Sequence, residues 1–268
     1  MRVSKHNVFF IANEFQTRGT CILYTELNEK GVFSEFAMDG VNPNTPEIYL
    51  KMDVATILSA AKVWKMPRKE FKNHAFKPGS KFCVIRLTRK DDNRAYIMLE
   101  ITSPADGGGP DREVTVEVPV KILTRKAWDD YVQPSHEESR IYCTLPSAKT
   151  FRTVCHKMKQ MDDYVQFKGK STGSLALEMS KSVFSVSSKL RKLTNHKPVP
   201  EDELGNPIHF QAKCTVNIAL LYHILCSYLH EHSIVRMFIY DDPIPKLGLI
   251  MSHHDIVIVA VFPHVMNG

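Results

Sequence analysis

The stretch from Ser147 to Met161, SAKTFRTVCHKMKQM, decides how this chain is organised. Wound as an α-helix, it separates its apolar and basic residues onto opposite faces, and the Ser147 hydroxyl can cap the first turn. The apolar face carries Phe151, Val154, Cys155, Met158 and Met161. The opposite face carries Lys149, Arg152, His156 and Lys159. The pattern therefore predicts an amphipathic helix that buries one side and presents cations on the other.

The basic face of this predicted helix contains no acidic residue. Solvated helices usually mix the two signs of charge, because Glu–Lys pairs one turn apart stabilise them. A face of one sign indicates a negatively charged partner. The alternative is a basic face that is merely solvated, and the helix alone does not distinguish the two.

The composition is that of a folded globular protein. The chain has 268 residues, of which 43% are hydrophobic and 24% charged, and its net charge is +6. That excess is compatible with a nucleic acid or an acidic partner, but such values are common. There is no signal-peptide pattern, and no apolar run approaches the roughly 18 residues needed to cross a bilayer, so we expect no membrane association.

The six cysteines form no C-x-x-C pair, and several stand within apolar strand or helix patterns. They are typical of buried, reduced thiols in a cytosolic or nuclear protein. They occupy positions 21, 83, 143, 155, 214 and 226.

Hydrophobic periodicity outside the central helix predicts mainly strands. Helices are expected at 54–65, 147–161 and 217–229, the first and last capped by Asp53 and Asn217. Strands are expected at 2–4, 7–12, 20–27, 32–38, 47–52, 81–87, 94–102, 114–123, 140–145, 164–168, 175–179, 183–190, 209–215, 234–240, 247–252 and 256–262.

One unit recurs in this series: a strand, a capping residue, a helix, and then two or three antiparallel strands. Three copies begin with EIYLKMDVATILSAA, RIYCTLPSAKTFRTV and FQAKCTVNIALLYHIL. The strands at 2–38 resemble the end of a fourth copy whose first strand and helix would lie upstream. Since each helix has one apolar stripe to bury, the units predict an α+β protein with antiparallel sheets and helices on one face.

The repeats divide the chain into two similar domains. We assign 1–123 to a first domain, incomplete at its N-terminus, and 139–268 to a second. Periodicity fails between them, so 124–138 is the expected connecting loop, with Trp128 and Tyr131 as candidates to anchor it to a neighbouring surface.

No residue pattern indicates catalysis, a metal site or a cofactor. The histidines at 230, 232, 253 and 254 lack companion Cys or carboxylate ligands, so surface or turn positions are favoured. His254 and Asp255 are expected in a tight turn between two strands. Gly107–Gly109 has no following helix or lysine, which argues against a phosphate-binding loop.

Several segments, together with the repeated unit, resemble the sliding-clamp superfamily. Within it, the resemblance is to the Hus subunits of heterotrimeric DNA-damage checkpoint clamps. It runs along most of the chain and weakens after about residue 165. The segments that carry it are FSEFAMDGV (33–41), EIYLKMDVATILSAAK (47–62), VPVKILTRKAWDD (118–130) and YCTLPSAKTFRTVCHKMKQM (142–161).

The resemblance implies a DNA-clamp fold and a non-catalytic subunit of a ring that encircles duplex DNA without reading its sequence. The implied partners are two other checkpoint clamp subunits, a dedicated clamp loader, and repair enzymes and checkpoint proteins that use the ring as a platform. The implied location is the nucleus, with a cytoplasmic pool before assembly. Helices line the hole of such rings, so the implied DNA-facing residues are Lys149, Arg152, His156, Lys159 and Lys62.

Ring assembly in this family uses sheet edges. By the family pattern, the strand Arg112–Val120 would pair with one partner subunit and Ser182–Leu190 with the other; the alternative is two ordinary edges shielded in a monomer. The implied interface residues are Arg112, Val114, Val116, Val118 and Val120 on the first strand, and Val183, Ser185, Ser187 and Lys189 on the second.

Family members carry an initial strand and helix before the position that matches Met1. This departure leaves a second reading open, a truncated isoform that stays outside the ring and binds a single partner. A third reading, an exonuclease, would need clustered carboxylates for metal-assisted hydrolysis, and the sequence offers no such cluster.

Overall fold

The computed structural model covers the whole chain and describes residues 1–12, 21–38, 46–64, 82–90, 93–103, 112–131, 135–228, 232–241 and 244–265. The chain forms two compact units. The first unit comprises Met1–Val3 and Asp39–Asp130, and the second comprises Ser4–Met38 and Tyr131–Gly268. Among the described helices, none is both long and apolar enough to span a membrane.

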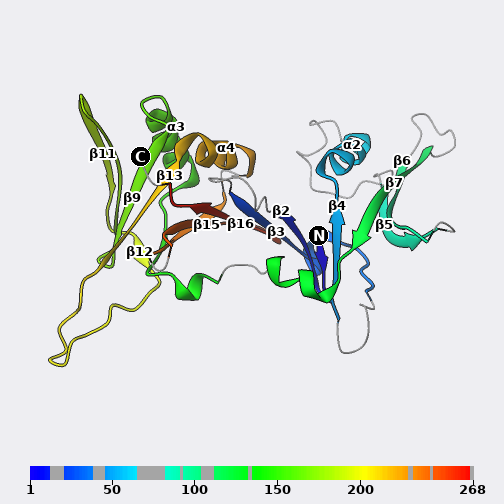
Figure 1. Cartoon of the computed structure of the whole chain (residues 1–268), viewed down its shortest axis with the longest axis horizontal. Helices are drawn as coiled ribbons and strands as arrows, with labels where there is room; N and C mark the ends of the chain where they lie inside the picture. Colours follow the sequence, from blue (N-terminus) through cyan, green and yellow to red (C-terminus); the bar gives the residue numbers. More distant parts are fainter. Residues whose placement is uncertain are drawn as a thin grey trace. The chain divides into compact units, whose positions relative to one another are not determined.

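The second unit contains two antiparallel sheets and two long helices (Figure 1). The strands that this unit contributes to the larger sheet have the order β12-β8-β14-β15-β16-β3-β2, and the other sheet has the order β11-β10-β9-β13. The elements are β2 (Asn7–Ala12), β3 (Ile22–Asn28), α1 (Glu29–Val32), η4 (His136–Glu138), β8 (Ile141–Thr144), α3 (Ala148–Lys159), β9 (Tyr164–Lys170), β10 (Ser174–Lys181), β11 (Phe184–Leu190), β12 (Thr194–Asn195), β13 (Gln211–Asn217), α4 (Ile218–Tyr228), β14 (Ile234–Tyr240), β15 (Lys246–His253) and β16 (Ile256–Pro263).

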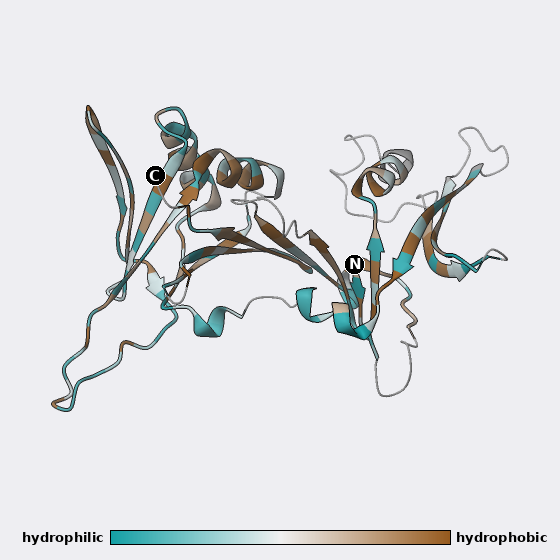
Figure 2. Ribbon diagram, in the orientation of Figure 1, coloured by the Kyte–Doolittle hydropathy of each residue, from teal (hydrophilic) through white to brown (hydrophobic). Residues whose placement is uncertain are grey.

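Alternation along the strands of the second unit directs one row of apolar side chains toward α3 and α4. In β10, Leu175, Leu177 and Met179 are buried while the residues between them are more exposed. These side chains share one apolar cluster with residues of both helices and both sheets. Figure 2 shows this concentration of hydrophobic residues in α4 and in the neighbouring strands. The cluster fixes both helices on the sheets.

A second, smaller cluster lies on the opposite side of the β14–β15–β16 meander. It is aromatic and β-branched, and it leaves no room for a side chain at position 248 of β15. A Cβ atom added to Gly248 would lie 1.9 Å from the Phe238 ring. The buried members are Tyr24, Phe238, Tyr240, Val259 and Val261.

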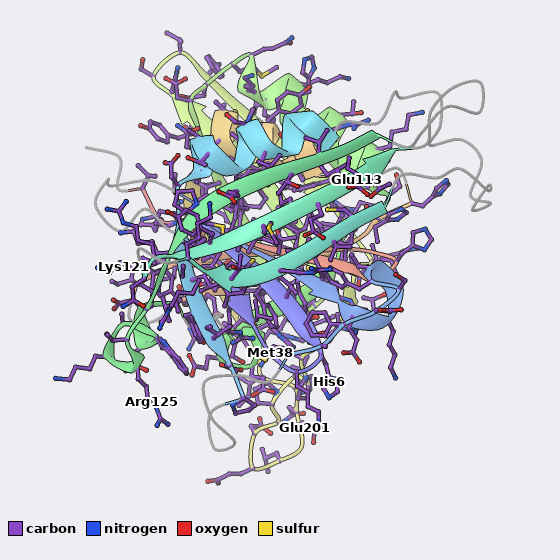
Figure 3. The ribbon with its side chains drawn as sticks, turned by 90° about the vertical axis from the view of Figure 1, so that its right-hand side faces the viewer. His6, Met38, Glu113, Lys121, Arg125 and Glu201 are labelled. Atoms are coloured by element: carbon purple, nitrogen blue, oxygen red, sulfur yellow. The ribbon has the colours of Figure 1, made fainter. Side chains whose placement is uncertain are left out.

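The strands of the first unit follow the hydrogen-bonded order β1-β4-β7-β6-β5, and the unit has one long helix. Its elements are β1 (Arg2–Val3), β4 (Ile48–Met52), α2 (Val54–Trp64), β5 (Phe82–Arg89), β6 (Ala95–Ser103), β7 (Arg112–Ile122) and η2 (Arg125–Ala127). The short helix η3 (Asp129–Tyr131) spans the boundary between the units. Figure 3 shows β5, β6 and β7 face-on, with Glu113 near one end of β7 and Lys121 near the other.

The core of the first unit lies between α2 and its sheet, and its buried members are Leu50, Ala60, Ile97 and Val118. Asp53 begins α2 by accepting hydrogen bonds from the backbone N–H and the hydroxyl of Thr56, both at 2.8 Å. These bonds lower the pKa of the Asp53 carboxyl. The cap expected from the sequence is therefore present.

The recurrent unit expected from the sequence is confirmed in three places. The series β4-α2-β5-β6-β7, β8-α3-β9-β10-β11 and β13-α4-β14-β15-β16 each run strand, helix and three antiparallel strands. The three caps, Asp53, Ser147 and Asn217, each accept a backbone N–H at the start of the helix that follows.

One expected strand is wrong. The segment Val32–Met38 forms no strand, because a helical turn, α1, occupies Glu29–Val32 and the chain beyond it is irregular. The Asn28 side chain accepts the Lys30 N–H at 3.0 Å and so begins a helix where the β-rich pattern predicted an extended chain.

The two compact units differ from the domains assigned from the sequence. Residues 4–38 belong to the second unit because β3 pairs along its length with β16, from Ile256 opposite Leu27 to Val261 opposite Ile22. Long-range strand pairing of this kind leaves no signal in local periodicity. Within the loop 124–138, the anchoring role suggested for Trp128 is confirmed. Its ring stacks on Tyr49 at 4.5 Å, and its indole N–H donates to the Leu123 carbonyl.

Candidate nucleic-acid interface

The exposed face of α3 carries a row of cations whose spacing follows the helix. We call Lys149, Arg152, His156 and Lys159 the basic row. Lys149, His156 and Lys159 are exposed and Arg152 is half-buried. The buried residues of the same helix are Ala148, Phe151, Cys155 and Met158. The two faces therefore separate as expected, except that Met161 lies beyond the last turn and is exposed.

The sequence around the basic row explains its orientation. Ser147 accepts the Thr150 N–H and starts the helix at a fixed residue, so every later side chain takes a set angle around the axis. Phe151 and Cys155 enter the apolar cluster of the second unit, which holds the helix against rotation. The cations then point away from the core by necessity.

The basic row stays unneutralised within the described part of the chain. Three other cations of the second unit do have an acidic partner: Lys168 pairs with Glu178, Arg140 with Asp241 at 2.9 Å and Lys181 with Asp162 at 3.4 Å. No ion pair among the described residues engages Lys149, Arg152 or Lys159. Cations one turn apart repel each other, so an anion placed over this face would relieve the repulsion.

Tyr222 of α4 adjoins the basic row. The Lys159 ammonium lies 5.0 Å from the centre of the Tyr222 ring, and the His156 ring lies 5.2 Å from it. A hydrogen bond with Cys226 raises the pKa of the Tyr222 hydroxyl, while the positive charge of Arg152 opposes that shift. The ring thus connects three members of the row to the neighbouring helix, which Figure 1 shows beside α3.

Sequence reasoning missed Tyr222. The pattern IALLYHIL is apolar on most sides, so it does not distinguish the tyrosine from a core residue, and it predicts an outer face of Ala219, His223, Ser227 and His230. His223 and Ser227 are exposed as expected, and His230 lies outside the described residues. The available signal was an aromatic residue with a polar tip in an otherwise aliphatic helix. Lys157 is a further exposed cation of α3, outside the predicted row.

Lys62, the remaining DNA-facing candidate, belongs to α2 of the first unit. Its side chain lies outside the described part of the structure. Its role stays a prediction.

The expectation that Arg112–Val120 is an open edge strand is wrong for the C-terminal end of this segment. Val120 of β7 pairs with Met52 on one side and with Ala95 on the other, so it is not on an open edge. Toward the start of β7, Val114, Val116 and Val118 pair with β6, and β4 does not extend that far. The Arg112 side chain lies outside the described part.

The second expected edge strand, β11, is the outermost strand of its sheet and pairs with β10 over its whole length. Ser185, Ser187 and Lys189 lie on β11 and are exposed. Val183 precedes the strand in a turn, which corrects its assignment. The main-chain groups on the far side of β11 have no strand partner among the described residues.

The remaining polar groups were compared with the arrangement that a metal ion requires. Among the described residues, no group of three His, Cys, Asp or Glu side chains is placed to hold a metal ion. His232, His253 and His254 line a surface pocket of about 370 Å³ with Ile234 and Ser252. His254 occupies the left-handed region at φ 50°, in the turn before β16, as expected.

The sequence profile of the family described as Hus1-like protein matches residues 1–265, almost the whole chain. The chain belongs to the Hus1-like family. Checkpoint protein HUS1 of Homo sapiens is 27% identical over 195 residues, which is 73% of this chain and 64% of the human protein. Checkpoint protein Hus1-like of Drosophila melanogaster is 22% identical over 194 residues, which is 72% of this chain and 65% of that protein.

The Hus1-like chain also matches a known fold. The crystal structure of PCNA from Thermococcus kodakaraensis superposes with a TM-score of 0.61 and 15% sequence identity, covering 98% of this chain and 89% of that one. The fold is therefore the PCNA-like clamp fold, mixed α+β with mostly antiparallel sheets, as expected from the repeated unit. The Hus1-like chain spans somewhat less than two thirds of the length of the two curated relatives.

Proposed function

We propose that this chain is a non-catalytic subunit of a ring-shaped heterotrimeric checkpoint clamp and that its basic row faces the phosphates of encircled duplex DNA. The observation that carries the proposal is the acid-free, unneutralised face of α3 on a PCNA-like fold of the Hus1-like family. Lysine and arginine bind phosphates without reading sequence.

The chemistry of the row suits loose contact with DNA. Lys149 and Lys159 are long and exposed and Arg152 is half-buried, and the described part of α3 places no pair of side chains for reading bases among them. Non-specific affinities are roughly 10⁻⁴–10⁻⁶ M at physiological salt, and a closed ring needs no more because its topology retains the DNA. Contacts of this strength allow sliding.

Salt dependence of duplex binding tests the row. Changing Lys149, Arg152 and Lys159 together to Gln should weaken binding and lower the slope of log K against log[salt] by about 0.9 for each phosphate that the variant no longer neutralises. A control with equal net charge carries Lys51, Lys126 and Lys246 changed to Gln, all exposed on other elements. Equal slopes for the two triple variants would overturn the assignment of the row.

Assembly tests the ring. Mixed with the two other clamp subunits, the chain should elute in size exclusion as a 1:1:1 complex, with a full-length family member as the positive control. Substituting Ser187 of β11 by Pro removes a main-chain donor from that edge and should block one of the two subunit interfaces. Its control, Ser174→Pro, lies in β10, where it would lower the melting temperature of the chain instead.

A subunit that binds one partner and stays outside the ring is the second candidate. A stable 1:1 complex with one subunit, and no third subunit at any concentration, would support it. The clamp loader, repair enzymes, checkpoint proteins and a nuclear location belong to the first proposal and are tested only after the ring forms.

A further inference from the structure

Arg236 lies in β14, on the face of the sheet that turns away from α3 and α4. Its neighbours in the strand, Val235 and Met237, belong to the apolar cluster that both helices share. Side chains alternate along a strand, so Arg236 points to the opposite face, together with Phe238 of the smaller aromatic cluster. Figure 1 shows both helices on the same side of β15 and β16, which leaves the second face on the other side.

The strands around Arg236 contain no acidic residue. β8, β12, β14 and β15 carry Arg236, Lys246 and His253 as their only basic residues. Asp241, which follows β14, pairs with Arg140 at 2.9 Å. Among the described residues, no ion pair engages Arg236, although this residue is half-buried. Its guanidinium has therefore lost part of its hydration without gaining an anion.

A hydroxyl and an imidazole adjoin Arg236 on the same face. Thr144 of β8 lies directly opposite Arg236 in the antiparallel register, so their Cβ atoms are about 5 Å apart. The Thr144 hydroxyl oxygen lies 2.7 Å from Nε2 of His196. When Nε2 carries the proton, His196 donates to the Thr144 oxygen, and the hydroxyl proton of Thr144 is then available to an anion. The arrangement brings hydrogen-bond donors of different lengths to one place.

Two residues earlier in β14, the same face is apolar. Ile234 is 51% exposed. It lines the surface pocket of about 370 Å³ together with Ser252, which lies opposite it in β15, and three histidines. A strand rises by about 3.3 Å per residue, so Ile234 and Arg236 stand about 7 Å apart along this face. In an extended peptide, a residue and the second residue after it have the same spacing.

We propose that the outer face of β14 is a docking surface for a segment of a partner protein that carries a phosphorylated serine or threonine. A phosphate brings a charge of about −1.5 to −2 and three acceptor oxygens, which suit the fork of Arg236 beside the Thr144 hydroxyl. An apolar side chain two residues from the phosphate would reach Ile234 and its pocket. We call this surface the Arg236 patch, and it comprises Thr144, His196, Ile234, Arg236 and Ser252.

Charge complementarity favours a phosphate over a carboxylate, and a peptide over DNA. A carboxylate has two oxygens and one charge, so it would leave part of the donor set unused. Duplex DNA presents a series of phosphates, which matches the cations spaced along α3 better than a single guanidinium beside an exposed isoleucine. The inference is independent of DNA binding and of ring formation.

Fluorescence anisotropy with the full chain tests the Arg236 patch. The probe is the labelled peptide Gly-Leu-Gly-pSer-Gly-Leu-Gly, in which leucine stands two positions to each side of phosphoserine. One control peptide has serine in place of phosphoserine, and the other has glycine in place of both leucines. The chain should bind the probe about tenfold or more tightly than the serine peptide, because hydrogen bonds to a charged group are the strong ones. It should also bind the probe more tightly than the glycine peptide.

Variants of the chain assign the binding to particular side chains. Arg236→Gln should lower the affinity for the probe by about tenfold or more, and Arg236→Lys, which keeps the charge without the fork, should lower it less. Arg125→Gln is the matched control, because it removes the same charge from an exposed residue of the first unit and should leave binding unchanged. Ile234→Ser should reduce the affinity for the probe to that for the glycine peptide. The circular dichroism spectrum of each variant should equal that of the unmodified chain.

Four outcomes would overturn the proposal. One is the absence of probe binding up to about 1 mM peptide. Another is an equal loss of binding in Arg236→Gln and Arg125→Gln, which would mean that only net charge matters. Loss of probe binding in the triple variant of the basic row, with binding by Arg236→Gln unchanged, would place the peptide on α3. Weaker duplex binding by Arg236→Gln, without weaker probe binding, would identify nucleic acid as the occupant of the patch.

Discussion

At the scale of single residues, four of the five thiols of the second unit separate clearly by burial; Cys21, the fifth, is half-buried. Cys143, Cys155 and Cys214 are buried, and burial raises the pKa of each to about 12. Cys226 is exposed on α4. Alkylation requires the thiolate and access to it. Iodoacetamide at pH 8 should therefore modify Cys226 and leave the three buried thiols intact, as measured by peptide mass spectrometry. In a concentration of chaotrope that unfolds the chain, all four of these thiols should react with iodoacetamide. Alkylation of Cys155 in the folded chain as fast as that of Cys226 would contradict the burial of this face of α3.

Tyr222 offers a second test at this scale, because its ring lies against both Lys159 and His156. An exposed cation–π contact is worth about 0.5–1 kcal/mol. Tyr222→Ala should weaken duplex binding about two- to fivefold, because the ring no longer holds the Lys159 ammonium in place. Because no cation is removed, the salt slope should stay unchanged.

Tyr222→Phe separates the ring from the hydroxyl. It keeps the contact with Lys159 and removes the hydrogen bond with Cys226. Binding by this variant should equal that of the unmodified chain. Binding as weak as that of Tyr222→Ala would mean that the hydroxyl, and not the ring, positions the basic row.

At the scale of elements, the β14–β15 pair depends on a missing side chain. Phe238 lies opposite Gly248 in the register, and its ring fills the space where a Cβ would stand. Gly248→Ala should destabilise the second unit by about 1–3 kcal/mol, as overpacking does in cores, and lower the urea midpoint. Adding Phe238→Leu should recover part of that stability. Equal midpoints for Gly248→Ala and the unmodified chain would show that the ring moves aside freely.

Helices and most strands of this chain could be predicted from local sequence. The caps at Asp53, Ser147 and Asn217 and the period of the α3 segment located three helices within a few residues, because these signals act between near neighbours. Alternation located most of the strands for the same reason.

Pairing between distant strands was the part that could not be predicted. The place of β7 between β4 and β6 and the attachment of residues 4–38 to the second unit rest on contacts far apart in sequence. In the candidate site, the basic row followed from helical spacing. Tyr222 did not, because its partners lie on another helix.

At the scale of the whole molecule, the two units differ in how much core they bury. Among the described residues, the first unit buries a small cluster around Leu50, Ile97 and Val118 and leaves Ile85 and Leu87 exposed. The second unit buries a far larger cluster that draws on two sheets and two helices. Burial of apolar surface is the main source of folding free energy, so the first unit should be the less stable.

Intrinsic probes can follow each unit separately. The chain has two tryptophans, Trp64 and Trp128, and both belong to the first unit. The thiol of Cys155 reports on the core of the second. In a urea titration, tryptophan fluorescence should change at a lower urea concentration than the labelling of Cys155, because the first unit, with its small core, unfolds first. Coincident transitions would instead mean that the chain unfolds as one cooperative body.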